Sequence, residues 1–110
     1  MQAESLTDLV RQHLEIARSA SSGRSAHTVH GGHEHRLRQT LIALAAGHRL
    51  DEHESPGEAT LQVLHGTVTL VAGEERHDGA TGDLIVIPDS RHSLEAVDDA
   101  VVMLTVAMQV

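Results

Sequence analysis

From residue 37 onward, short apolar runs rich in Leu and β-branched residues are separated by Gly, Asp and Pro, and this pattern restricts the fold most. The runs are residues 37–45, 59–64, 67–72, 84–87 and 100–108. Runs of this length and composition, closely spaced between turn residues, are typical of strands in an all-β barrel or sandwich. The chain has no Phe, Tyr or Trp, so the core between these strands must be aliphatic.

The clearest turn signal is His65-Gly66, because a two-residue connection that ends in Gly is typical of an antiparallel hairpin. This hairpin would set Val63 opposite Val68 and Leu61 opposite Leu70. Alternation then predicts a core side, made of Ala59, Leu61, Val63, Val68, Leu70 and Ala72, and a polar side with Thr60, Gln62, Thr67 and Thr69.

A different period precedes the strands. Residues 4–19 carry apolar side chains at helical spacing, with Ser5 or Thr7 near the start as a capping residue. The small polar stretch 19–25 (SASSGRS) reads as a linker. We therefore expect a single chain organised as residues 1–25, helix and linker, and residues 26–110, the β domain; the helix should lie on the barrel or on a partner subunit.

Composition excludes several functions. Acidic residues outnumber Lys and Arg by 16 to 8, and the net charge of -8 repels nucleic acid. No apolar run is long enough to cross a membrane, no export signal opens the chain, and Cys is absent, which together favour a cytoplasmic protein. We expect no direct nucleic-acid or membrane partner.

Ten histidines are the unusual feature of the composition, and they are spread unevenly. The segment from His27 to His35 holds four of them with Gly punctuation, which suits a mobile loop or an edge strand at least as well as a metal site. Two pairs of acidic residues read as turns: Glu74-Glu75 beside Gly73, and Asp98-Asp99 between two apolar runs.

Two short motifs in residues 37–108 resemble the cupin family. In the first, Gly47 is followed after five residues by His53, and Gly66 closes the motif; Ser55 and Ala59 occupy positions where the family has a second His and a Glu. In the second, Gly82 is followed after five residues by Pro88, and then by Ser90 and His92. Residues 67–81 between the motifs match the compact spacing of small bacterial cupins.

The resemblance implies an all-β fold, a double-stranded β-helix or jelly-roll barrel with one N-terminal helix. It also implies that His53 and His92 lie side by side in the barrel pocket as the retained ligands of one divalent transition metal: zinc, nickel, iron or manganese. Two histidines supply fewer ligands than such an ion needs, so Gln39, His48 or His77 could add a third, and Glu58 only if a bulge turned it inward. Two pocket histidines without a metal, as hydrogen-bonding groups, remain the other interpretation.

We expect the ligand pocket to be made of His53, Ser55, Ala59, Leu61, His92 and Met103. Two functions follow from this site. The first is a module that binds a small molecule without catalysis; the second is a metal-dependent enzyme, a dioxygenase or isomerase acting on a small polar metabolite. The apolar stripe of the helix, with Thr60, Gln62 and Thr69, favours a homodimer.

Overall fold

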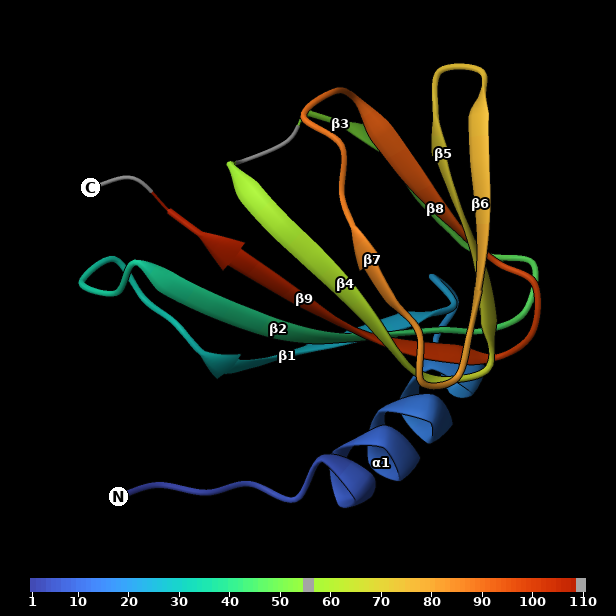
Figure 1. Cartoon of the computed structure of the whole chain (residues 1–110). Helices are drawn as coiled ribbons and strands as arrows, with labels where there is room; N and C mark the ends of the chain where they lie inside the picture. The colour runs from blue at the N-terminus through green and yellow to red at the C-terminus, as the bar shows by residue number, and fades with distance from the viewer. Residues whose placement is uncertain (55–56, 109–110) are drawn as a thin grey trace.

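The computed structural model describes residues 1–54 and 57–108, and it shows one helix followed by two antiparallel sheets that pack face to face (Figure 1). In chain order the elements are α1 (Leu6–Ser19), β1 (Arg24–His30), β2 (Leu37–Leu44), β3 (Arg49–His53), β4 (Glu58–His65), β5 (Thr67–Ala72), β6 (Glu75–Ala80), β7 (Leu84–Val86), β8 (His92–Ala96) and β9 (Ala100–Ala107). The all-β prediction with one N-terminal helix is confirmed.

The two sheets exchange strands along the chain. Sheet A has the order β1-β2-β9-β4-β7, and sheet B has the order β3-β8-β5-β6. From β2 to β9 the chain therefore crosses between the sheets at every connection except the β5–β6 hairpin, as in a jelly roll. Figure 1 shows the sheets converging where β4 meets β5 and β6 meets β7, and spreading apart toward the β5–β6 hairpin.

The hairpin predicted at His65-Gly66 is wrong. β4 pairs with β9 and β7, while β5 pairs with β8 and β6, so each strand already has both edges occupied. The two-residue link instead carries the chain from sheet A to sheet B, and Gly66 adopts φ +83 there. The predicted core side is nevertheless right for Leu61, Val63, Val68 and Leu70, since the inner faces of both sheets meet in one core.

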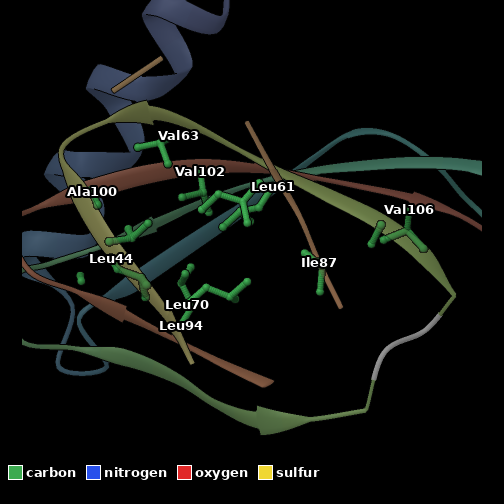
Figure 2. Close-up of a cluster of buried hydrophobic side chains, with 13 residues drawn as sticks. Leu44, Leu61, Val63, Leu70, Ile87, Leu94, Ala100, Val102 and Val106 are labelled. Atoms are coloured by element: carbon green, nitrogen blue, oxygen red, sulfur yellow. The ribbon is translucent and has the colours of Figure 1, made fainter. Parts of the chain in front are cut away.

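The core between the sheets is aliphatic throughout. Its buried members include Leu44, Val63, Ala100 and Val102, which cluster where the sheets converge (Figure 2). We call this region the closed end. The opposite region, where β3 ends, β8 begins and β5 turns into β6, is the open end.

The helix covers the outer face of sheet A. Ser5 caps it, since its Oγ accepts the backbone N–H of Asp8 at 3.2 Å. Leu14 and Ala17 are buried against Leu41, Val101 and Met103 in a second cluster. The apolar stripe of the helix is thus used within the chain. The described helix is too short to cross a membrane.

Asp98 and Asp99 form the connection between β8 and β9, and Asp99 has a structural role there. Its carboxylate accepts the backbone N–H of Ala46 at 2.8 Å and pairs with Arg18 Nε at 2.6 Å. These two contacts, with the Ala46 hydrogen bond first, hold the pKa of Asp99 below its ordinary value. Asp99 thereby ties the helix to the closed end.

Candidate functional site

Sheet B brings His53 and His92 together at the open end. His53 is the last residue of β3, His92 is the first of β8, and the register pairs them directly. A register shift between Leu50 and His53 precedes this pair. The imidazole centroids are 4.4 Å apart and the ring planes are inclined by 65°. Two residues that are distant in sequence therefore share one small volume.

Backbone carbonyls fix the orientation of both rings. Nδ1 of His53 lies 3.0 Å from the carbonyl oxygen of Asp51, and Nδ1 of His92 lies 2.9 Å from that of Ser90. A carbonyl oxygen can only accept, so each Nδ1 donates its proton to it, and Nε2 is the nitrogen left to accept a hydrogen bond or to bind a metal. A histidine that donates its other nitrogen to a carbonyl is the usual arrangement of a metal ligand or a hydrogen-bond acceptor.

An arginine clamp stands beside the pair. Arg91 Nε donates to Glu52 at 2.9 Å, and its Nη1 donates to Glu54 at 3.1 Å. These hydrogen bonds, with Glu52 first, raise the pKa of the Arg91 guanidinium above its ordinary value. The clamp joins the end of β3 to the start of β8, and so holds the exposed His53 against the buried His92.

The other predicted pocket residues are distributed over three places. Ala59 and Leu61 are buried on the inner side of β4, as part of the core between the sheets. Ser55 lies outside the described residues. Met103 is a correction: it lies in the cluster beneath the helix, because β9 turns Val102 inward and Met103 outward.

None of the candidates for a third ligand joins the two histidines. Gln39 donates to Thr105 Oγ1 at 3.3 Å, and His48 lies against Gly23. His77 lies in β6 opposite Leu70, and Glu58 is exposed, as alternation predicts. Among residues 1–54 and 57–108, no cluster of three or more His, Asp and Glu side chains could hold a metal ion. Within that part of the chain, the protein thus offers His53 and His92 as a two-ligand site.

The histidine-rich segment forms edge strand β1 and the connection to β2. His27 Nε2 lies 2.9 Å from Glu4 Oε1, and the His27 ring stands 5.5 Å from that of His13. His30 and His35 stack at 4.6 Å. The segment lies at the outer edge of sheet A, away from His53 and His92, which belong to sheet B.

A cleft of about 580 Å³ opens between edge strands β6 and β7. Leu70, Ile85 and Pro88 give it an apolar wall, and Ala72, Glu75 and His77 lie along its other side. The sequence pattern does not predict this cleft, because it indicates that Glu75 belongs to a turn. In the structure the turn is only Gly73-Glu74, and Glu75 starts β6 opposite Ala72. The sequence feature that indicates the β5–β6 hairpin is the two-residue link Gly73-Glu74, which follows the apolar run 67–72 and precedes a polar strand.

Comparison with known proteins places the fold. An RmlC-like cupin protein from Desulfovibrio desulfuricans matches with a TM-score of 0.74 and 24% identity, over 97% of this chain and 96% of the other. A conserved protein of unknown function from Streptococcus pyogenes matches with a TM-score of 0.73 and 26% identity, over 83% of this chain and 79% of the other.

A larger enzyme contains the same arrangement of strands. Salicylate 1,2-dioxygenase from Pseudaminobacter salicylatoxidans matches over 91% of this chain and 33% of its own length, with a TM-score of 0.74 and 19% identity. This likeness shows the fold alone. No protein-family model and no curated protein sequence matches this chain.

Proposed function

Because this chain has the cupin fold, we propose that it binds a small molecule at the open end of the barrel, through His53 and His92. The observation that carries the proposal is the fixed orientation of both imidazoles. Each Nδ1–H is engaged by a carbonyl, so two Nε2 acceptors are presented together from paired strands. A pair held in this way is ready to accept hydrogen bonds or to bind a cation.

The orientation of these two nitrogens suits a divalent transition metal, but the number of protein ligands is smaller than such an ion needs. Both rings have the orientation that a metal ligand needs, with Nδ1–H held by a carbonyl and Nε2 left for the metal. A tetrahedral or octahedral ion needs four to six ligands, so waters or the bound molecule would have to complete the shell. When bound, the metal would supply Lewis acidity; His53 and His92 would hold it, and the Arg91 clamp would keep them in register.

Elemental analysis of untagged protein tests the metal, with the double variant His53→Ala, His92→Ala as the comparison. Metal in stoichiometric amount that disappears in the variant supports a metal-assisted site. Equal metal content in both proteins assigns any bound ion to other histidines and leaves a metal-free binding module.

A metal-dependent enzyme, of the dioxygenase or isomerase type, is the second candidate. The observation that favours it is the retention of one histidine in each motif, at adjacent strand positions. Substrate turnover that requires both His53 and His92 would establish it. A protein that binds ligands at these residues and converts none of them would be a binding module.

We also propose a cytoplasmic homodimer. The helix stripe packs on its own sheet, and Thr69 lies on sheet B, apart from Thr60 and Gln62 on sheet A, so neither forms the pairing surface. Strand β7 supports pairing, because its Leu84 and Val86 are 64% and 73% exposed beside Gln62 and Thr60. Light scattering should give twice the chain mass, and Leu84→Glu should return a monomer; a monomeric wild type at high micromolar concentration contradicts the proposal.

A further inference from the structure

A row of four residues crosses sheet B at the open end. His53 is opposite His92, and Ala72 is opposite Glu75. Extending the β5–β8 register by one residue beyond its last ladder pair places Ala72 opposite His92. The row therefore runs His53, His92, Ala72, Glu75 through strands β3, β8, β5 and β6.

This row faces the space between the sheets. Leu70 and Leu94 pair on the inner face and are buried in the core. Ala72 and His92 lie two residues further along the same strands, so they share that face, and Glu75 shares it as the partner of Ala72. Glu75 thus points toward the same side of the sheet as the histidine pair.

Ala72 makes a shelf between the two polar ends of the row. With strands about 4.8 Å apart, the Cα atoms of His92 and Glu75 are roughly 10 Å apart, and only a methyl group stands between them. The cleft between β6 and β7 reaches this shelf, since Ala72 and Glu75 both border it. Leu70 and Ile85 supply apolar surface for the middle of a ligand.

The polar groups of the row are hydrogen-bond acceptors. Nε2 of each histidine is the nitrogen left to accept, because its Nδ1–H is held by a carbonyl, and an ionised Glu75 can only accept. Arg76 at the border of the cleft is paired with Glu95 at 3.1 Å. The net charge of -8 further disfavours an anionic ligand.

We propose that the row selects a small aliphatic amine with donor groups at both ends, and that Glu75 binds the ammonium group remote from the histidines. The proposal rests on the proposed function, because His53 and His92 hold the other end. The methylene chain lies over Ala72 and Leu70. Glu75 is here a specificity-determining residue, since it distinguishes a diamine from a monoamine of the same length.

Histidine-detected NMR with defined probes tests the assignment. 1,4-Diaminobutane and 1,5-diaminopentane are compared with n-butylamine at pH 8 and 0.15 M salt, where non-specific attraction is screened beyond about 8 Å. The His53 and His92 signals of the wild type should shift with the diamines, and butylamine should bind about tenfold more weakly, because it lacks one charge-assisted hydrogen bond.

Glu75→Gln and Glu74→Gln form a matched pair, since they remove the same charge from neighbouring residues, one in β6 and one in the turn. We expect Glu75→Gln to weaken diamine binding about tenfold and Glu74→Gln by less than twofold. Ala72→Val should be tolerated, because Val is favoured in strands. Its larger side chain should fill part of the space between His92 and Glu75 and weaken diamine binding, while both histidines keep their response to Zn²⁺.

The outcomes separate this inference from the proposed function. The role of Glu75 is overturned if both Gln variants bind diamines equally well. It is also overturned if diamines leave the histidine signals unshifted while Zn²⁺ shifts both. Either result leaves the histidine site standing. Histidines that respond neither to diamines nor to Zn²⁺ overturn both proposals.

Discussion

The closed end and the open end of the barrel are built from the same strands, yet they differ in what fills them. At the closed end, Val63, Val68, Ala100 and Val102 fill the interior almost without exposure. At the open end, the inner face of sheet B carries two imidazoles, a methyl group and a carboxylate. Packing at one end provides stability, so the other end can carry polar groups on the inner face.

The closed end should dominate stability, and two leucines test this. Leu44, at the closed end of β2, is 1% exposed, whereas Leu37, at the opposite end of the same strand, is 47% exposed. Leu44→Ala should lower the free energy of unfolding by about 3 to 5 kcal/mol, through lost burial and a cavity. Leu37→Ala should lower it by less than about 1 kcal/mol. Urea denaturation measures both; equal losses would mean that the two ends are not energetically distinct.

Two glycines sharpen the same comparison. Gly66 at the closed end and Gly73 at the open end both have positive φ, +83 and +62. A Cβ on Gly66 would overlap the carbonyl oxygen of Asp99, whereas one on Gly73 meets nothing within 4 Å. Gly66→Ala should cost about 2 to 3 kcal/mol and Gly73→Ala only about 1 to 2, the cost of left-handed backbone. Similar melting temperatures for the two variants would contradict close packing at the β4–β5 link.

At the open end, adding a metal ion should change the free energy of unfolding more than removing the His53 side chain does. Zn²⁺ at ten times its dissociation constant should stabilise the wild type by about 1.4 kcal/mol. His53→Ala should abolish this gain and leave the metal-free stability within about 0.5 kcal/mol, because His53 is exposed. His30→Ala in the edge strand is the control and should keep the gain. Loss of the Zn²⁺ effect in His30→Ala alone would move the site to the histidine-rich segment.

The smallest expected effect is a pH dependence at the closed end. The folded pKa of Asp99 is lowered by Ala46 and Arg18, so its contribution to stability is complete above its unfolded value. It is lost as the pH falls through the lowered folded pKa. The destabilisation of Asp99→Asn, about 1 kcal/mol at pH 7, should therefore shrink in acid. A constant difference between pH 7 and pH 3 would exclude this role.

The same two regions explain what the sequence could predict. Five strands with Leu and β-branched residues, β2, β4, β5, β7 and β9, follow from composition alone. The four missed strands, β1, β3, β6 and β8, are interrupted by His, Arg, Asp or Glu, so their pattern does not read as apolar alternation. Three of them belong to sheet B, which holds the site.

The site was predictable only through its motif spacing. The positions of His53 and His92 after Gly47 and Gly82 indicated a pair, whereas the partnership of Ala72 with Glu75 depends on strand register, which no local pattern specifies. Met103 shows the converse error: the run that contains it is apolar on both faces, because the helix covers one of them. Periodicity cannot distinguish the two faces of such a strand.

Imidazole ¹⁵N NMR of His53 and His92 tests the central claim, that the open end is a binding site made by two oriented histidines. Spectra are recorded at pH 8 without and with Zn²⁺. We expect both rings as Nδ1–H tautomers in the free protein, and both Nε2 signals to shift together when the metal is added. Rings in mixed tautomers, or a response confined to His27, His30, His33 and His35, would contradict the account.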